Sequence, residues 1–483
     1  MLIAFSSCVA GRKAYNPDKK FSPAQLQRDF DLYRKVLEER HPSLYWYTSK
    51  VAMDSIFEVA RRQLADSMTE TAFRKVLMVT TAAIQCGHTS VKASKKGLKY
   101  FDTLQTKPQF PVSLKIWSDT AVLTKNTFQS EKKLSRGDRV EAVNGISMLH
   151  LLDTFYHYIP ADGGNQVAKN QWLSSGNRFG LLFNTVYGTQ KEFTIQYTDT
   201  SGVTNRTLLT PVVIKKDSMA QHKKKPQPKP EKKSKAARLM EMRSLRIDST
   251  GTTAVMELNS FAKGLRLTSF FRNSFRELRK KEVTHLIIDL RLNGGGRVVS
   301  STLLTKYLAE KNFKLADSLY ARTRTSRYSR YIKGDFWMKL IVKLNTRKKA
   351  PEQYHYVFFE KHYFKPKRKH HFGGQVYILS GGLTYSASTL VMQVLRPQPN
   401  ITLVGEPSGG AAYGNTAWLI PDVTLPQTKV RFRLPLFRLV IDKSQPKDGQ
   451  GVLPEIWATP SAQAIKNGED YKMQRVRRIL SEN

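Results

Sequence analysis

A short loop of small and hydroxyl-bearing residues, 380–388, is the first place in the sequence where side chains could do nucleophilic chemistry. The loop follows the apolar run 376–379, and a helical pattern begins at about Ser386. Free N–H groups and the positive dipole end at the start of a helix stabilise an alkoxide or a tetrahedral oxyanion. Ser386 is therefore a candidate nucleophile. The loop alone explains Ser386 equally well as a helix cap, and Ser388 could be the cap while Ser386 reacts.

A second loop, Asn293-Gly294-Gly295-Gly296, follows the apolar strand pattern 284–290. Consecutive glycines allow close approach of the backbone and unusual dihedral angles. Such a loop can donate an N–H group to an oxyanion or surround a phosphate. Because no Gly-Lys-Ser/Thr follows, the pattern is not that of a nucleotide phosphate-binding loop.

Serine chemistry also needs a base, and His88 is the histidine whose position suits one. Most of the ten histidines lie in polar or basic stretches, where a solvated side chain is the ordinary expectation. His88 instead comes directly after the apolar-faced helical pattern 69–86. The negative end of that helix dipole would stabilise an imidazolium formed during proton transfer. A purely structural histidine is the alternative.

The elements expected around the two loops are those of an open α/β sheet. Apolar runs without polar alternation are typical of buried parallel strands, and functional groups gather at the carboxyl ends of such strands. The sequence therefore predicts an α/β domain over 245–460, with a basic and aromatic insertion at about 318–372. Its predicted strands are 254–258, 284–290, 376–379 and 401–404, and its predicted helices are 267–280, 298–310 and 386–395.

Residues 21–95 are predicted to form an N-terminal helical region that carries His88. Its first helix opens at Ser22-Pro23, an N-cap followed by proline, and stops before His41-Pro42. Two further helical patterns cover 51–66 and 69–86. A C-terminal helix is expected within 461–483.

Residues 110–213 are expected to be β-rich. In 134–145 a Gly-Asp turn precedes a strand and an Asn-Gly turn follows it. This order looks like the core of a PDZ domain, a module that captures extended chain ends at a sheet edge. Any hairpin would explain the same residues. The segment 214–244 is low in complexity and self-repelling, and we expect a basic, disordered linker.

The charge is strongly positive, with 79 Lys and Arg against 39 Asp and Glu and a formal net charge of +40. The runs 215–238 and 322–349 supply 17 of these charges. Nucleic acid is a possible partner for such runs, but neither run lies in a recognisable nucleic-acid module, and the two cysteines, at 8 and 86, do not have a zinc-finger spacing. We expect solvated loops, with phosphates of an anionic membrane surface as the possible partner. No apolar stretch is long enough for a transmembrane helix, and no metal or other cofactor is expected.

The first eight residues end in small residues before Cys8, like the end of a bacterial lipoprotein signal. Seven residues are too few for a complete signal, and the usual basic start is missing. We expect a lipidated Cys8 on a periplasm-facing lipoprotein of the cell envelope, with residues 1–20 as its tether. A chance cysteine is the alternative.

Four motifs follow one another along the chain: Leu286 to Arg291 with Asn293 to Gly296, Ser386-Ala387-Ser388, Leu403 to Gly410, and Gly451 to Ile456. In this order they resemble the serine peptidase family of C-terminal processing (tail-specific) proteases and the tricorn core. The resemblance covers about 250–460. It implies a multidomain α/β fold, with a crotonase-like catalytic domain, an N-terminal helical region and a PDZ-like insert.

The family uses two catalytic arrangements. The processing proteases pair the serine with a lysine in a Gly-Lys-Gly context, but residues 409–415 contain no lysine, and Lys429 and Lys443 lie in a different setting. The resemblance therefore favours the tricorn-like branch, which takes a histidine from the N-terminal helical region. Gly87-His88-Thr89 looks like that motif. Asp448 stands at the position of the tricorn acid, although it is Asp rather than Glu and could be a turn residue.

The resemblance implies acyl transfer: Ser386 attacks a peptide carbonyl, His88 takes and returns the proton, and Asp448 orients His88. We therefore expect a serine endopeptidase of the bacterial cell envelope acting on a peptide or protein substrate. The alternative is a non-catalytic peptide- or lipid-binding envelope protein on the same fold. The N–H groups expected to bind the oxyanion are those of Gly295 and Ala387, with Gly294 as the alternative glycine.

Overall fold

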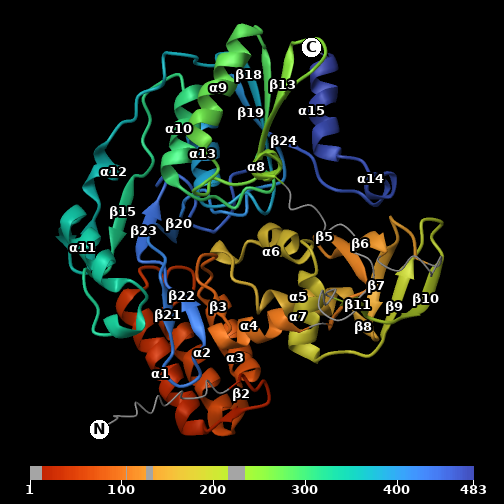
Figure 1. The fold of residues 1–483 in the computed structure, drawn as a ribbon, viewed down its shortest axis with the longest axis vertical. Helices are drawn as coiled ribbons and strands as arrows, with labels where there is room; N and C mark the ends of the chain where they lie inside the picture. Colours follow the sequence, from red (N-terminus) through yellow and green to blue (C-terminus); the bar gives the residue numbers. More distant parts are fainter. Residues whose placement is uncertain (1–13, 105, 127–133, 216–233, 483) are drawn as a thin grey trace, which may run out of the picture.

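The computed structural model describes residues 14–104, 106–126, 134–215 and 234–482 (Figure 1). Helices near the N-terminus lie at the bottom of the view, a mixed sheet-and-helix insert lies at the right, and an α/β unit forms the top. The chain is thus a multidomain mixed α/β protein. Cys8 and most of the predicted tether lie outside the described residues, as does 216–233 of the predicted linker.

The N-terminal helices begin where the sequence predicts them. Ser22 caps the first helix in a capping box with Gln25, and Pro23 occupies its first turn. The helices are α1 (Pro23–Arg40), α2 (Lys50–Arg62), α3 (Glu70–Ala83) and α4 (Lys95–Thr103). A short β1 (Lys20–Phe21) pairs with β2 (Met68–Thr69).

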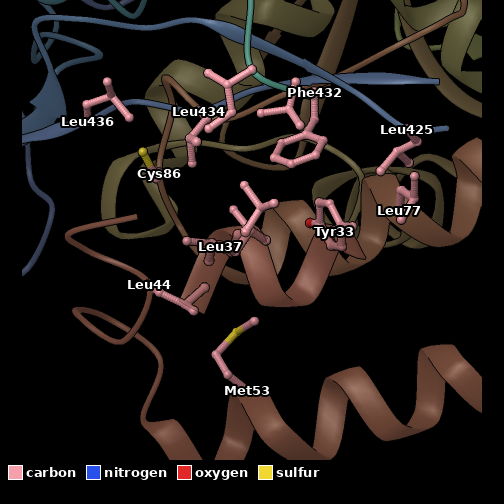
Figure 2. Packing of buried hydrophobic residues seen from close by; sticks show 14 of the residues in the cluster. Tyr33, Leu37, Leu44, Met53, Leu77, Cys86, Leu425, Phe432, Leu434 and Leu436 are labelled. Carbon is pink, nitrogen blue, oxygen red and sulfur yellow. The ribbon is translucent and has the colours of Figure 1, made fainter. Parts of the chain in front are cut away.

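These helices share one core with strands from the far end of the chain. The ring of Tyr33 on α1 meets Phe432 edge-on at 5.0 Å, and both side chains are fully buried. Figure 2 shows Tyr33, Leu37 and Leu77 packed against Phe432 and Leu434. The strands involved are β21 (Asp422–Thr424) and β22 (Arg431–Arg433), which pair with each other, and β22 also pairs with β3 (Val91–Lys92). The N-terminal region is therefore completed by the C-terminal part of the chain.

The insert contains the predicted strands and turns. Asn144 and Gly145 both have positive φ, at 51° and 78°, as a tight hairpin turn requires. The antiparallel order is β10-β9-β7-β6-β5, with β8 on β7 and a separate β4–β11 pair. The strands are β4 (Thr106–Gln109), β5 (Val112–Trp117), β6 (Thr120–Asn126), β7 (Arg139–Val143), β8 (Ile146–Ser147), β9 (Phe193–Thr198), β10 (Thr204–Leu209) and β11 (Val212–Lys215).

Helices missing from the sequence prediction cover the same insert. They are α5 (Met148–Tyr156), α6 (Gln166–Leu173) and α7 (Arg178–Tyr187). Each has only eight to ten residues, so local propensity is weak and tertiary packing decides the conformation. Phe155, Phe179 and Phe183 are buried in the insert's own core beside Phe110 and Phe193. The insert is therefore mixed rather than β-rich.

The α/β unit has a six-stranded sheet in the order β12-β13-β14-β18-β19-β24, parallel except for β12. Alternate strand residues face opposite sides: Leu286 and Ile288 pack under α9, α10 and α13, whereas Ile287 packs with α15. The strands are β12 (Arg243–Ile247), β13 (Thr253–Leu258), β14 (His285–Asp289), β18 (Gln375–Ser380), β19 (Ile401–Gly405) and β24 (Ile456–Trp457). The helices are α9 (Leu267–Lys280), α10 (Val298–Leu308), α13 (Ala387–Leu395) and α15 (Tyr471–Glu482).

Three segments differ from their expected form. The basic segment at 318–372 contributes β15, β16 and β17 to a second sheet, in the order β16-β17-β15-β23-β20. The predicted linker contains a helix, and the C-terminal segment holds two helices. The elements are α8 (Lys235–Met242), β15 (Ser318–Ala321), α11 (Asp335–Asn345), β16 (Arg347–Ala350), β17 (Gln353–His355), α12 (Val357–Lys361), β20 (Gly414–Ala417), β23 (Phe437–Val440) and α14 (Ala462–Asn467).

Within the described parts of the chain, no helix is long and apolar enough to cross a membrane. The same residues contain no group of three or more His, Cys, Asp or Glu side chains placed to hold a metal ion.

The shared core predicts a test of how the two ends of the chain depend on each other. Phe432→Ala removes a fully buried ring between α1 and β22, and we expect it to lower the free energy of unfolding by about 3–5 kcal/mol. Urea denaturation followed by circular dichroism measures the change. Leu149→Ala, at a side chain that is 66% exposed, is the control and should shift stability by no more than about 0.5 kcal/mol. Equal midpoints for the two variants would contradict a shared core.

Candidate active site

Ser386 lies between β18 and α13 with a hydroxyl that serves no capping role. It occupies the N-cap position of α13, yet its side chain makes no capping hydrogen bond. Its φ of 57° with ψ of −118° is a strained conformation for a residue other than glycine. The Ser388 hydroxyl is buried without a hydrogen-bond partner among the described residues, so it does not cap the helix either. The half-buried Ser386 is therefore available for chemistry.

Thr384 ties the serine loop to its neighbours. Its hydroxyl donates to the Leu290 carbonyl at 2.9 Å and accepts from the Gly381 N–H at 3.1 Å. Its own carbonyl accepts from the N–H groups of Gly409 and Gly410, at 3.0 and 3.2 Å. The loops after β14, β18 and β19 are thus joined at one buried residue, as expected for the carboxyl ends of adjacent parallel strands.

The glycine loop lies directly against Ser386. A Cβ on Gly295, whose φ is +95°, would come within 2.8 Å of the Ser386 Cβ and 3.0 Å of the Ala387 nitrogen. The close approach predicted for this loop therefore occurs. The Gly295 N–H donates to the Asn293 Oδ1 at 3.0 Å, whereas the N–H groups of Gly294 and Ala387 make no hydrogen bond with any described residue.

His88 reaches the same place from the N-terminal region. Its ring lies 5.2 Å from the ring of Tyr385, centroid to centroid, and a Cβ on Gly87 would overlap the Tyr385 hydroxyl. Burial, with a smaller effect of the Arg433 charge, lowers the pKa of His88 to about 3. The imidazole is therefore neutral at pH 7, as a general base must be. No hydrogen bond joins His88 to Ser386 in the described structure, and the His88 Nδ1 is buried without a partner there.

Asp162, in the loop after α5, is a buried acid beside His88 that the sequence prediction missed. Its Oδ1 accepts the Gly87 N–H at 2.9 Å, and its Oδ2 is buried. Burial raises the pKa of Asp162 to about 6. The pKa of Tyr385 is also raised, first by burial and then by the nearby charge of Asp162. The signal in the sequence was an Asp followed by two glycines, in a stretch that lacked any other motif.

Asp448 is close to this loop but does not contact His88. Its side chain is exposed, and its Oδ1 accepts the N–H of Gln450 at 2.8 Å. The next residue, Gly449, packs on Gly163: a Cβ on Gly449 would fall 2.3 Å from the Gly163 Cα. Asp448 therefore packs near the turn at Asp162 and does not lie beside His88, the histidine that it was predicted to orient.

The lysines of the alternative dyad lie elsewhere. Lys429 follows the β21 turn and lines a hollow with Arg330, and the backbone N–H of Lys443 donates to Asp317. Lys472 on α15 is buried near the serine loop, but its Nζ donates to the Ser380 carbonyl and pairs with Glu406 at 2.7 Å. An ion-paired ammonium cannot accept a proton, so Lys472 is not placed to act as base.

Comparison with known proteins identifies the domain that carries this site. Residues 252–457 match the model of peptidase family S41. The chain carries an S41 peptidase domain. This segment contains the two glycine and serine loops and Asp448, whereas His88 and Asp162 come from outside it. This match supports a serine-type peptidase.

Solved structures show the same fold over nearly the whole chain. Mature CPAF gives a TM-score of 0.65 at 13% sequence identity, over 95% of this chain and 97% of CPAF. The complex of mature CPAF with lactacystin gives 0.63 at 13% identity, over 95% and 98%. At such low identity the likeness establishes a common fold. No curated protein matches the chain.

The raised pKa of Asp162 predicts a pH dependence of stability. The folded chain keeps this carboxyl protonated up to a pH of about 6, whereas the unfolded chain loses the proton near pH 3.8. Between these two pH values the folded state binds more protons than the unfolded state. The contribution of Asp162 to the stability of the folded state is therefore full below pH 3.8 and is lost as the pH rises through 6. Asp162→Asn keeps an oxygen that can accept the Gly87 N–H. Because an amide does not titrate, the substitution removes the loss of stability that the carboxyl causes as the pH rises.

We therefore expect the stability of Asp162→Asn relative to the wild type to increase with pH, by at most about 3 kcal/mol. Chemical unfolding of both proteins at a series of pH values measures the difference. A difference that stays flat between pH 4 and pH 7 would show that the carboxyl titrates as in the unfolded chain.

Proposed function

We propose that this S41 domain hydrolyses peptide bonds through an acyl-enzyme, with Ser386 as nucleophile and His88 as base. The observation that carries the proposal is the meeting of an uncommitted, strained serine at a helix start with a neutral histidine that packs on the preceding residue. The two residues are almost 300 positions apart in the sequence. Neither is needed for capping or for an ion pair, so a catalytic role explains both.

In the proposed mechanism the Ser386 Oγ attacks the peptide carbonyl carbon while His88 takes its proton. The new Oγ–C bond creates an oxyanion beside the start of α13, where the Ala387 N–H is free to donate. Collapse breaks the C–N bond, and His88 gives the proton to the leaving amine. Water then attacks the ester by the same route. Substrate binding has to bring His88 into hydrogen-bonding reach of Ser386, because catalytic hydrogen bonds often tighten only in the complex.

The second oxyanion donor is proposed to come from the glycine loop. Gly295 touches Ser386, but its N–H already donates to Asn293, so it must exchange that partner for the oxyanion. The N–H of Gly294 has no such partner and is the alternative. Asn293 is fully buried and also donates to the Leu258 carbonyl, which holds the loop in place.

Two acids are candidates for orienting His88. Asp448 is the one predicted from the tricorn resemblance, and its loop packs on the 162–163 turn. Asp162 acts through the backbone: by accepting the Gly87 N–H it fixes the turn that carries His88. We propose Asp448 as the acid that reaches the imidazole during catalysis and Asp162 as a positioning residue.

The finer family placement is also proposed. The lack of a lysine in 409–415 and the ion pair of Lys472 with Glu406 favour the tricorn-like Ser/His branch. The site lies on what we propose to be a crotonase-like domain with a PDZ-like insert. One edge of the insert's sheet is already covered, because the β5 N–H of Ile116 donates to Ser174 beside α6. A substrate strand would therefore add to the β10 edge.

We further propose a bacterial envelope location, with Cys8 as the lipidated residue, on the evidence of the sequence around it.

Ser386→Ala tests the nucleophile. Removing the Oγ eliminates the acyl-enzyme, so we expect kcat/KM on a casein-type peptide substrate to fall by at least about a thousandfold without loss of folding. A fluorophosphonate probe should label the wild type at Ser386 and leave the variant unlabelled. Failure of the wild type to react with the probe or with peptides would favour the non-catalytic binding protein.

His88→Ala tests the choice of base. We expect at least about a hundredfold loss of kcat, because the serine is then left without a proton acceptor. The matched controls are Lys429→Ala and Lys443→Ala, the lysines a dyad would require, and both should stay within about twofold of the wild type.

Asp448→Asn tests which of the two acids, Asp448 or Asp162, orients His88. If Asp448 orients His88, this variant should lower kcat by about two to four orders of magnitude, as loss of an orienting carboxylate does. Wild-type activity in Asp448→Asn together with a large loss in Asp162→Ala would transfer that role to the 162 turn.

A further inference from the structure

The helix α11 presents an apolar face to solvent. Five of its large apolar side chains are between 42% and 75% exposed: Phe336, Trp337, Leu340, Ile341 and Leu344. Their spacing of three to four residues places Trp337, Leu340 and Leu344 in one stripe along the helix. Single exposed apolar residues are ordinary, but a continuous stripe marks an interaction surface.

The opposite face of α11 is fixed to the protein, so the apolar stripe cannot turn inward. Val342 is fully buried, and Met338 packs against the core shared by the N-terminal helices. Asp335 at the start of the helix is buried and faces Arg40 of α1 at 3.8 Å. It also accepts a hydrogen bond from Ser329. In Figure 1 α11 lies at the left edge of the molecule, on the side away from β10.

The surroundings of the stripe are cationic. Residues 322–349 contain ten Lys and Arg and one acid, and that acid is the buried Asp335. Lys333, Lys339 and Lys343 make no ion pair with any described residue. A hollow of about 310 Å³ next to the helix start is lined by Arg330, Lys333 and Lys429, a lining that suits a phosphate group.

We propose that α11 is a membrane-interface helix, with its apolar stripe inserted among lipid chains and its lysines and arginines on the phosphates of an anionic bilayer. Aromatic and leucine side chains on one face with lysines beside them are typical of helices that lie in a membrane surface. Each cation near such a surface adds to the attraction. The inference concerns a surface remote from Ser386 and does not depend on the proposed catalysis.

The chemistry of the patch favours a membrane over other occupants. A second copy of the chain would bring two strongly positive segments face to face, and their repulsion opposes self-association. Nucleic acid would pair with the cations but would leave Leu340, Ile341 and Leu344 in water. An anionic bilayer satisfies both features at once, because phosphates lie directly above an apolar layer.

Flotation of the full chain with lipid vesicles tests the proposal. We expect binding to vesicles of phosphatidylglycerol and phosphatidylcholine in equal amounts, weak binding to phosphatidylcholine alone, and weaker binding at high salt. Leu340→Ser with Leu344→Ser should reduce binding to the anionic vesicles at least about tenfold. The matched control is Leu149→Ser with Leu181→Ser, two exposed leucines on α5 and α7, which should bind as the wild type does.

Tryptophan fluorescence provides a second readout that does not require a loss of binding. Transfer of Trp337 into the headgroup region should shift the emission to shorter wavelength, and Trp337→Phe should keep the binding while reducing that shift. Equal binding by the stripe variant and its control would overturn the proposal. So would loss of binding only on deletion of 216–233, or a wild-type dimer that Leu340→Ser with Leu344→Ser converts to a monomer.

Discussion

The hydrogen bonds of Thr384 are the constraint on which the geometry of the active site depends. One buried residue holds the Leu290 carbonyl, the Gly381 N–H and the N–H groups of Gly409 and Gly410. These groups belong to loops that leave three adjacent parallel strands. Each loop by itself has many conformations, and joining them at one point removes most of that freedom. The strained backbone of Ser386 persists because the surrounding loops are fixed.

The site is nevertheless assembled from parts outside the sheet domain. His88 comes from the N-terminal helices and Asp162 from the insert, and the hydrogen bond between Asp162 and Gly87 joins those two parts directly. The Gly163–Gly449 contact then joins the insert to the end of the S41 domain. The position of His88 therefore depends on both contacts. This arrangement gives a physical route by which substrate binding on the insert could change the distance between base and nucleophile.

Positively charged side chains occur in two different settings, in ion pairs near the active site and unpaired on the surface around α11. Near the serine loop, the buried Lys472 pairs with Glu406 at 2.7 Å. Beside the apolar stripe of α11, Lys333 and Lys343 are exposed and make no ion pair with any described residue. Compensated charges stabilise a core, whereas uncompensated charges on a surface attract a partner of opposite sign. The same excess of Lys and Arg therefore includes a buried ion pair in one region and the proposed membrane surface in another.

The sequence by itself determined the strands β13, β14, β18 and β19, the helices α1, α9 and α13, the two loops and the candidates Ser386 and His88. These features depend on local rules: apolar runs, capping residues and glycines leave their signal in neighbouring residues. Sequence could not reveal the helices of the insert or the role of Asp162, because short helices and buried acids are decided by distant packing. Only the tertiary structure decided that Ser386 does not cap its helix and that His88 is neutral. It also placed Asp448 on the surface and α11 with its apolar side outward, since burial and contact are properties of the folded chain.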